Sequence, residues 1–340
     1  MFEKTILMTG GAGFIGANFA EYYATRHPTH RLIDLDALTY AAHRTAWEAQ
    51  ARTRNILPVE GDIRNAELVR FLFRTYDVTG VIHFAAESHV DNSITDPLRF
   101  VSTNVMGTGT LLNEALHHWR KKDCLETARF HHISTDEVYG SLGEEGFFTE
   151  TTPYAPNSPY SSSKAASDHL VRAYAHTYGM NVTISNCSNN YGPWQHNEKL
   201  IPTVIRRALA HEPIPVYGNG KNVRDWLWVG DHCAAIELIF RNGKAGESYN
   251  VGGHNEKSNL EIVGEICRLL GEMKPWPGHR YEELVTLVKD RPGHDFRYAI
   301  DPTKIRTELG WRARTSFKDG LHFTLNWYLT RWFGENLVLP

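Results

Sequence analysis

The chain has 340 residues, of which 41% are hydrophobic and 22% are charged, as in a globular protein with one large domain or two modest ones. A formal net charge of −3 gives it no overall basic surface for nucleic acid or anionic membranes. No apolar run approaches the roughly 18 residues of a membrane span, and no leader pattern precedes the first predicted strand, so we expect a cytoplasmic protein.

The cysteines and histidines indicate neither disulfides nor a metal site. The four cysteines show no C-x-x-C pairing, and the 18 histidines show no H-E-x-x-H or similar ligand spacing. Scattered cysteines of this kind are typical of reduced, buried thiols. We therefore expect no bound metal.

Strands and helices alternate through the first part of the chain. The strands are expected at residues 5–10, 31–38, 56–63, 78–87, 129–140 and 181–192. The helices are expected at residues 11–26, 65–76, 96–119 and 160–178. This order predicts an α/β fold with a doubly wound parallel sheet of the Rossmann type.

Beyond about residue 190, proline and glycine become frequent and the alternation weakens. This change predicts a smaller C-terminal α/β region that binds substrate. We expect residues 1–190 to form the first domain, with a returning segment near residues 222–245, and residues 191–340 to form most of the second. Because ligands of open α/β sheets bind at the carboxyl ends of the strands, the second region should supply loops over that edge.

The turn after the first strand is predicted to bind a dinucleotide. The segment TGGAGFIG places Gly10, Gly13 and Gly16 between a strand and a helix, where glycine lets the backbone approach a pyrophosphate. Asp36 ends the second strand, twenty residues beyond Gly16, where a carboxylate accepts ribose hydroxyls and repels a 2′-phosphate. Asp34 has the same facing, but Asp36 lies nearer the carboxyl end of the strand. The pattern therefore favours NAD over NADP.

Two later strand ends fit the same cofactor. Asp62 and Ile63 end the third strand, where they could meet the adenine. Ala85 and Ala86 end the fourth strand, and their small side chains would let a cofactor lie against the backbone. In both places, a strand end that merely needs small residues is the alternative.

A tyrosine and a lysine form a candidate catalytic pair. The segment PYSSSK sets Tyr160 and Lys164 four residues apart at the start of a helix, so they share one face. The ordinary pKa of tyrosine, about 10, is too high for a base at neutral pH, but a lysine ammonium and a nicotinamide cation nearby favour the phenolate. A lone Y-x-x-x-K is common by chance. The glycine turn upstream and Thr135 on the strand between them make Tyr160 a candidate base for removing a hydroxyl proton as hydride leaves carbon.

Longer motifs run through nearly the whole chain: TGGAGFIG, LTYA, AAESHVD, HHISTDEVYG, TPYAPNSPYSSSK, NCSNNYGP, EKLIP, VRDWLWVGDH, YNVGGHNEKSN and DRPGHDFRYAID. Together they resemble the extended short-chain dehydrogenase/reductase superfamily and, within it, the dTDP-glucose 4,6-dehydratases. Sugar-nucleotide epimerases of the superfamily keep the glycines and the Tyr/Lys pair, but usually carry small or hydroxyl residues in place of Asp136 and Glu137. The acid pair therefore favours the dehydratases.

The resemblance implies an NAD-dependent hydro-lyase of deoxysugar biosynthesis that converts dTDP-glucose to dTDP-4-keto-6-deoxyglucose. Oxidation at sugar C4 acidifies the C5 proton, whose removal needs a base, and loss of the C6 hydroxyl needs an acid. The resemblance assigns Glu137 as the base and Asp136 as the acid, with Thr135 and Tyr160 at the C4 oxygen. The hydride then returns to C6, so NAD stays bound throughout. Two acids capping a helix are the weaker alternative, because DEVYG reaches a glycine within four residues.

The resemblance also implies which residues contact the cofactor and the nucleotide sugar. The cofactor set is Gly10, Gly13, Phe14, Ile15, Gly16, Asp36, Leu38, Thr39, Asp62, Ile63, Ala85, Ala86, Ser88, Tyr160 and Lys164. The substrate set is His89, Asn189, Lys199, Leu200, Pro215, Tyr217, Arg224, Asn259, Arg291 and His294. Arg224 and Arg291 suit the diphosphate, since guanidinium groups pair bidentately with phosphate oxygens. Each residue by itself is also compatible with an ordinary surface or turn position.

Departures from the family pattern, such as the run from Trp194 to Asn197, leave a UDP-sugar or another nucleotide sugar open as the substrate. A UDP-glucuronate decarboxylase or an epimerase of the superfamily is the enzymatic alternative. A non-catalytic NAD-sensing protein is the alternative from another class, but it would have little reason to keep Tyr160, Lys164 and both acids together. The family usually dimerises through two helices of each subunit, and the helices near residues 98–119 and 160–178 are the candidates for a homodimer.

Overall fold

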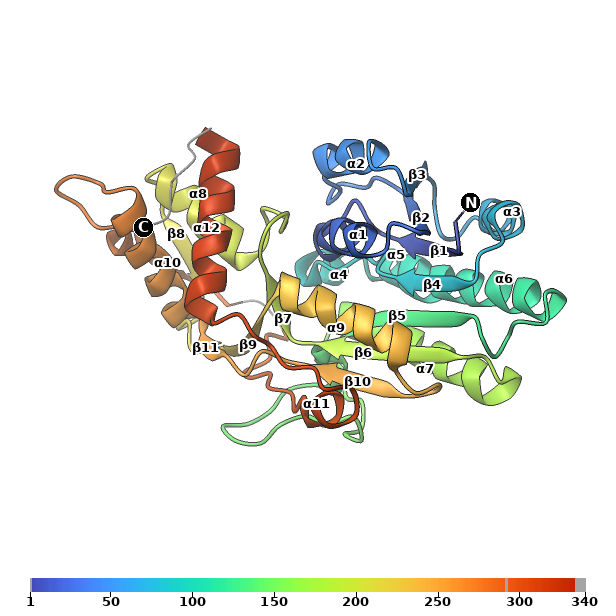
Figure 1. Cartoon of the computed structure of the whole chain (residues 1–340). Coiled ribbons are helices and arrows are strands. Elements are labelled where there is room, and N and C mark those ends of the chain that lie inside the picture. The colour runs from blue at the N-terminus through green and yellow to red at the C-terminus, as the bar shows by residue number, and fades with distance from the viewer. Residues whose placement is uncertain (1, 291–292, 334–340) are drawn as a thin grey trace.

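The computed structural model describes residues 2–290 and 293–333, which form a larger and a smaller lobe (Figure 1). Arg291, one of the two arginines predicted to contact the diphosphate, lies outside the described residues. Within the described part of the chain, no helix is long and apolar enough to cross a bilayer. The four cysteines are free thiols.

The larger lobe is built on a seven-stranded sheet with the strand order β10-β6-β5-β4-β1-β2-β3. Every neighbouring pair of strands in it is parallel. The strands are β1 (Lys4–Thr9), β2 (His30–Asp36), β3 (Ile56–Glu60), β4 (Gly80–His83), β5 (Arg129–Thr135), β6 (Val182–Cys187) and β10 (Ser248–Val251). The strand order reverses between β1 and β4, which is where a doubly wound sheet binds its ligand. The predicted Rossmann-type fold is therefore confirmed.

Helices cover both faces of this sheet (Figure 1). One face carries α1 (Phe14–Arg26) and α9 (Val229–Asn242), and the other carries α3 (Ala66–Tyr76), α6 (Gly107–Lys121) and α7 (Pro159–Tyr178). Alternation along β1 divides the core in the same way. Ile6 and Met8 pack with α1, whereas Leu7 packs with the helices of the opposite face.

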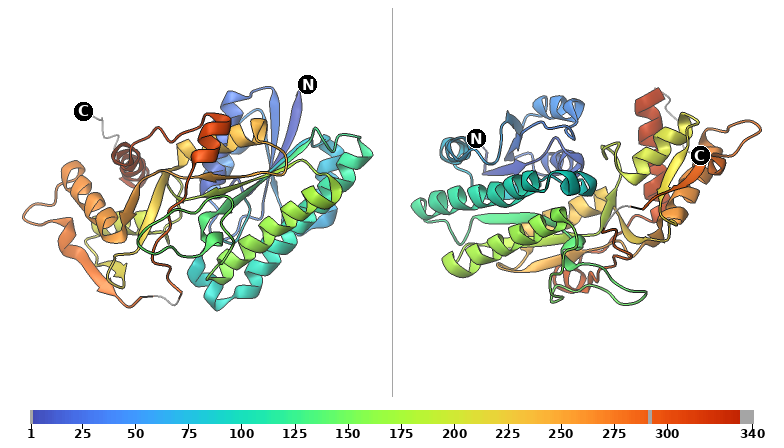
Figure 2. Two further views of the ribbon diagram at one scale, coloured as in Figure 1. Left: turned by 90° about the horizontal axis from the view of Figure 1, so that it is seen from below. Right: turned by 180° about the vertical axis from the view of Figure 1, so that it is seen from behind.

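The helix expected at residues 96–119 is made of three segments. They are α5 (Pro97–Phe100), the π-helical turn η1 (Val101–Met106), and α6. Figure 2 shows α6 and α7 running side by side along one face of the sheet, and the two helices are in contact.

Among the described residues, five short helical elements lie outside the main helices. They are α2 (Arg44–Ala51), α4 (Val90–Thr95), η2 (Asp136–Tyr139), η3 (Tyr281–Leu284) and α11 (Thr303–Leu309).

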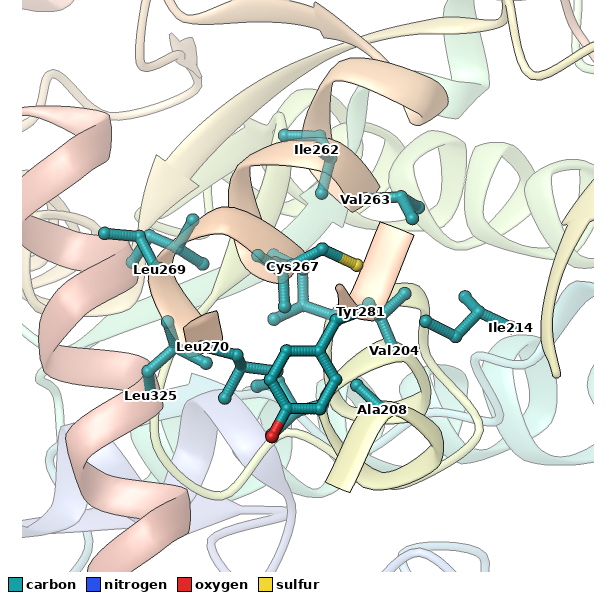
Figure 3. Close-up of a cluster of buried hydrophobic side chains, with 14 of the residues drawn as sticks. Val204, Ala208, Ile214, Ile262, Val263, Cys267, Leu269, Leu270, Tyr281 and Leu325 are labelled. Atoms are coloured by element: carbon teal, nitrogen blue, oxygen red, sulfur yellow. The ribbon is translucent and has the colours of Figure 1, made fainter. Parts of the chain in front are cut away.

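The smaller lobe has a hydrophobic core of its own, shown in Figure 3. Buried side chains such as Val204, Ile262, Leu270 and Leu325 join three helices there. Those helices are α8 (Leu200–Leu209), α10 (Asn259–Met273) and α12 (Phe317–Phe333). The parallel pair β8 (Ile214–Tyr217) and β12 (Val285–Val288) lies beside them.

A three-stranded sheet with the order β11-β9-β7 connects the lobes. It is formed by β7 (Asn189–Tyr191), β9 (Val223–Trp228) and β11 (Glu256–Ser258). The single strand expected at residues 181–192 is therefore divided at Ser188, because β6 pairs in the large sheet and β7 in the small one. The segment expected to return to the large domain, residues 222–245, contains β9 and α9. Strand β9 pairs in the small sheet, so the chain returns to the large sheet through α9 and then β10. The limits of the two domains remain a prediction.

Candidate active site

A cavity of about 420 Å³ opens at the carboxyl ends of the central strands and is closed on its other side by the segment that leads from β7 to α8. It contains most of the predicted site residues. Those in its wall are Gly10, Gly13, Phe14, Ile15, Gly16, Asp36, Thr39, Asp62, Ile63, Ala85, Ala86, Ser88, Thr135, Asp136, Glu137, Tyr160, Lys164, Asn189 and Lys199.

In the glycine turn at one end of the cavity, Gly10 and Gly16 have no room for a side chain. Gly10 has a φ of +79°, and a Cβ there would lie 2.6 Å from the amide nitrogen of Ala85. A Cβ on Gly16 would lie 2.2 Å from the carbonyl oxygen of Gly10. This tight packing directs the start of α1 at the cavity, and no side chain caps that helix start. Uncapped amides at a helix N-terminus favour an anion such as a pyrophosphate.

Asp36 and Asp34 occupy different places although they share one facing. The carboxylate of Asp36 lines the cavity and accepts hydrogen bonds from the amides of Ala12 (2.9 Å) and Leu38 (2.8 Å). Asp34 is fully buried beneath the turn, where it accepts a hydrogen bond from the Gly11 amide at 2.9 Å. Asp36 is thus the carboxylate that faces the cavity. Leu38 does not line the cavity and contributes only its amide to Asp36.

Two arginines line the cavity as well, and the sequence motifs did not reveal either of them. Arg64 forms a bidentate ion pair with Asp62, with its Nε 3.0 Å from both carboxylate oxygens. Arg99 pairs with Glu87, another residue of the wall, at 2.6 Å. Arg64 follows the predicted strand end at Asp62 and Ile63 by one residue, so the position next to a strand end was the signal available.

The Thr135 hydroxyl is hydrogen-bonded to both of the acidic residues that follow it. Strand β5 ends at Thr135, and the chain continues as η2, whose first turn holds Asp136 and Glu137. The Thr135 hydroxyl donates to Oδ1 of Asp136 and accepts the Glu137 amide, both at 3.3 Å. The same hydroxyl can instead donate to the phenolate form of Tyr160, which lowers the pKa of that tyrosine against the larger effect of burial. The two acids therefore do occupy the start of a short 3₁₀ helix, and they line the cavity at the same time.

Burial sets the protonation of this cluster. Asp136 is 1% exposed, and burial, followed by the neighbouring Glu137, raises its pKa well above the usual range. A carboxyl group with a raised pKa is suited to act as a general acid. Burial and then Glu137 also raise the pKa of Tyr160 well above its ordinary value, while the Thr135 hydrogen bond lowers it. Tyr160 is thus a phenol here, and positive charge beside it is needed for it to act as a base.

Lys164 is directed toward the carboxyl end of β5. Its Nζ donates to the carbonyl oxygen of Ile133 at 2.7 Å and lies 3.2 Å from Nε2 of His132. Burial lowers the pKa of Lys164 to about 8. The side chain therefore remains mainly charged at neutral pH.

The predicted substrate residues separate into two groups. Asn189 and Lys199 line the cavity, and Lys199 donates to the Ser88 carbonyl at 3.1 Å. His89 begins α4 beside them, with its Nε2 3.9 Å from Glu198, and Leu200 is the first residue of α8. His89 and Leu200 lie next to the cavity but are not part of its wall. The second group lies in the smaller lobe, away from the cavity wall, and consists of Pro215, Tyr217, Asn259 and His294. In that lobe the rings of Tyr217 and His294 lie 6.4 Å apart.

Arg224 is buried beside the catalytic end of the cavity. Its guanidinium donates to the carbonyl groups of Val223, Asp295 and Phe296 and lies 4.2 Å from the ring centre of Tyr298. The charge of Arg224 acts on Asp136 and lowers the pKa of that carboxyl, against the larger effect of burial. Several of its donors are thus held by the backbone, and a contact with a diphosphate remains a prediction.

Other wall residues were missed although they stand inside motifs that the sequence displays, and Cys187, Glu87 and Glu198 are examples. Cys187 precedes Ser188 in NCSNNYGP, and Glu87 and Glu198 belong to AAESHVD and EKLIP. Glu198 accepts from the Tyr40 hydroxyl at 3.4 Å and so connects the smaller lobe to the loop after β2. Its place in a loop made the contact impossible to derive from strand or helix periodicity.

The family model described as GDP-mannose 4,6 dehydratase matches residues 7–324. The dTDP-glucose 4,6-dehydratase of Xanthomonas campestris pv. campestris (strain B100) is 52% identical over 332 residues, covering 96% of this chain and 93% of the relative. The dTDP-glucose 4,6-dehydratase 1 of Escherichia coli K12 is 47% identical over 340 residues, covering 96% and 94%.

Solved structures of a dehydratase and of an epimerase both resemble this chain. A dTDP-glucose 4,6-dehydratase from Streptomyces venezuelae with NAD and TYD bound has a TM-score of 0.87 at 44% identity, covering 96% of this chain and 98% of that one. A UDP-glucose 4-epimerase from Thermotoga maritima has a TM-score of 0.84 at only 26% identity, covering 96% and 99%. Both of these enzymes share the fold of this chain, but the sequence of this chain is more similar to that of the dehydratase.

Proposed function

The chain belongs to the family of the dTDP-glucose 4,6-dehydratases, and on this premise we propose that it dehydrates dTDP-glucose to dTDP-4-keto-6-deoxyglucose, a reaction of deoxysugar biosynthesis. The observation that carries the proposal is the placement of Asp136 and Glu137 in the cavity that also holds Thr135 and Tyr160. An elimination across C5 and C6 needs both an acid and a base, whereas epimerisation at C4 needs neither carboxyl group.

NAD is the cofactor, and when bound it accepts a hydride from C4 of the sugar and later donates a hydride to C6. The residues present fit this group. Gly10 and Gly16 have no room for a Cβ, and the turn between them would present helix amides to a pyrophosphate. Asp36 would accept the ribose hydroxyls and would repel the 2′-phosphate of NADP. Tyr160 and Lys164 would stand at the nicotinamide end.

The protein side chains divide the proton transfers among them. Tyr160, assisted by Thr135, takes the proton of the C4 hydroxyl as the C4 ketone forms. Glu137 then removes the acidified C5 proton, and Asp136, whose pKa is raised by burial, gives its proton to the departing C6 oxygen. Two neighbouring carboxyl groups can take opposite roles where their environments differ.

The nucleotide sugar extends from this catalytic end toward the smaller lobe. Asn189 and Lys199 would contact it within the cavity. We assign the nucleotide part of the substrate to the predicted residues of the smaller lobe, among them Tyr217, Asn259 and His294. Arg224 would contact the diphosphate. Their positions in the smaller lobe support this assignment, since the sugar must reach the acids in the larger one.

We further propose that the protein is a homodimer. The segment that leads into α6 exposes large apolar side chains, with Leu98 75% and Met106 64% exposed. It lies alongside α7, the other helix expected at the interface. Exposed apolar side chains gathered on one segment are typical of a protein contact. A cytoplasmic location stays a prediction from the sequence.

The direct test is to incubate the purified protein with dTDP-glucose, and separately with UDP-glucose, without added cofactor. We expect a 4-keto-6-deoxy sugar from dTDP-glucose, identified by mass and NMR, and NAD released from the denatured protein. A C4 epimer as product, recovery of NADP, or net accumulation of NADH would contradict the proposal.

A further inference from the structure

Asp168 continues the helix face that carries the catalytic tyrosine and lysine. Tyr160, Lys164 and Asp168 are spaced four residues apart on α7, so they lie on the same side of the helix, and all three are buried. The Oδ2 of Asp168 accepts from the hydroxyls of Ser134 (2.8 Å) and Tyr154 (2.9 Å). The steps described above give this fully buried carboxylate no role.

His132 lies between Lys164 and Asp168. Its Nε2 is 3.2 Å from Nζ of Lys164 and 3.3 Å from Oδ1 of Asp168. Its Nδ1 has no hydrogen-bond partner among the described residues. The ring is neutral, because burial lowers its pKa to about 4. A neutral imidazole nitrogen is either a donor or an acceptor, so Nε2 can accept from the ammonium or donate to the carboxylate, but not both.

We propose that Asp168 is a positioning residue whose carboxylate charge keeps Lys164 protonated, and that His132, which lies between them, changes tautomer when Lys164 loses its proton. With Lys164 charged, Nε2 accepts from the ammonium and the ring proton is on Nδ1. With Lys164 neutral, the proton moves to Nε2 and is donated to Asp168. The proposal rests on the proposed function, in which the charge of Lys164 favours the Tyr160 phenolate.

The charges around Lys164 agree with this arrangement. Burial lowers the pKa of the lysine to about 8, and the Asp168 carboxylate is the largest influence in the other direction, followed by Cys187. Burial would raise the pKa of Asp168, but the polar and charged groups around it hold the pKa below its ordinary value, so the carboxyl group is ionised. His83 on β4 also faces this group and is neutral, because burial lowers its pKa. The Cys187 thiol on β6 is neutral too, since burial raises its pKa to about 12.

The first experiment measures the pH dependence of kcat/KM for Asp168→Asn. The ammonium and the carboxylate both approach the same nitrogen of His132, which places them less than roughly 7 Å apart, and removing the carboxylate charge at that distance should lower the pKa of Lys164 by about 1–2 units. Activity is lost as pH rises through the pKa of Lys164, so the basic limb should move to lower pH by that amount. Activity near pH 6.5 should change much less.

Tyr154→Phe is the matched control, because it removes one hydrogen bond to the same carboxylate but leaves its charge. Its basic limb should coincide with that of the wild type. If the limb of Asp168→Asn also stays in place, Asp168 is only a structural anchor and the proposal is overturned.

A second measurement needs no Asp168 variant and no turnover, and so holds even if Asp168→Asn fails to fold. In the wild-type protein with its retained cofactor, ¹⁵N NMR of labelled histidine reports the tautomer of each ring, and the His132 signals are identified by their absence from His132→Gln. We expect the Nδ1–H form at pH 6.5 and the Nε2–H form above the basic limb. An unchanged tautomer across that range would overturn the proposal. A protein that shows the tautomer change but makes no 4-keto-6-deoxy sugar would instead contradict the proposed function.

Discussion

Replacing Gly16 by alanine should remove cofactor binding by displacing the start of α1. The added Cβ would lie 2.2 Å from the Gly10 carbonyl oxygen and 2.8 Å from the Gly11 Cα. Because both atoms belong to the backbone, no side chain can move aside to make room. Real contacts of this kind begin near 3.0 Å, so the helix must move away from the turn by roughly 1 Å, and a misplacement of that size can reduce activity by about 100-fold.

The cost should also appear in stability, since overpacking of this kind destabilises a fold by about 1–3 kcal/mol. We expect Gly16→Ala to purify with little NAD, measured by its release on denaturation, and to lose at least about 100-fold in turnover. Gly264→Ala is the control, because a Cβ at that position in α10 meets nothing within 4 Å. Alanine is favoured over glycine in a helix interior by about 1 kcal/mol, so this variant should keep its NAD and be at least as stable. Retention of a full complement of NAD and normal activity by Gly16→Ala would refute the reasoning.

The remaining predictions concern the acids, the interface and acid stability. Glu137→Gln should still reduce bound NAD on mixing with dTDP-glucose, but it should exchange solvent deuterium into C5 of the sugar about a hundred- to ten-thousand-fold more slowly. Asp136→Asn should keep that exchange, but the sugar should lose its C6 oxygen more slowly than in the wild type. Normal exchange and product formation in Glu137→Gln would make Glu137 structural. Leu98→Glu combined with Met106→Glu should convert the dimer to a monomer, measured by light scattering. Leu287→Glu, at a position 57% exposed in the smaller lobe, should leave the dimer intact. A monomeric wild-type protein at micromolar concentration would contradict the proposed dimer. Burial lowers the pKa of His132 to about 4 and that of His232 to about 3, so the unfolded chain binds more protons than the folded one as pH falls below about 6.5. The free energy of unfolding should therefore decrease from pH 6.5 toward pH 4, by up to about 1.4 kcal/mol per pH unit for each histidine, and denaturant titrations of His232→Gln should show a shallower decrease; an equal slope would indicate that His232 is not buried and neutral.

The sequence alone was enough to predict the doubly wound sheet and the family. The reason is that each signal is local. Gly10, Gly13 and Gly16 mark one strand-to-helix turn, Tyr160 and Lys164 lie on one turn of a helix, and their spacing needs no knowledge of distant segments. Parallel strands also bring their carboxyl ends to one edge, so residues at several predicted strand ends could be expected to meet there.

Tertiary packing decided what local patterns could not express. The small sheet joins β7, β9 and β11, which are far apart in the chain, so nothing in residues 181–192 showed that a strand would be divided at Ser188. The contacts of Arg224 with backbone carbonyls depend on the segment near Asp295, and the place of Asp36 above Asp34 depends on the packing of the glycine turn. The arrangement of Lys164, His132 and Asp168 arises because α7 lies across β5, and the charge of each group then depends on burial and on neighbours that only the fold brings within a few ångströms.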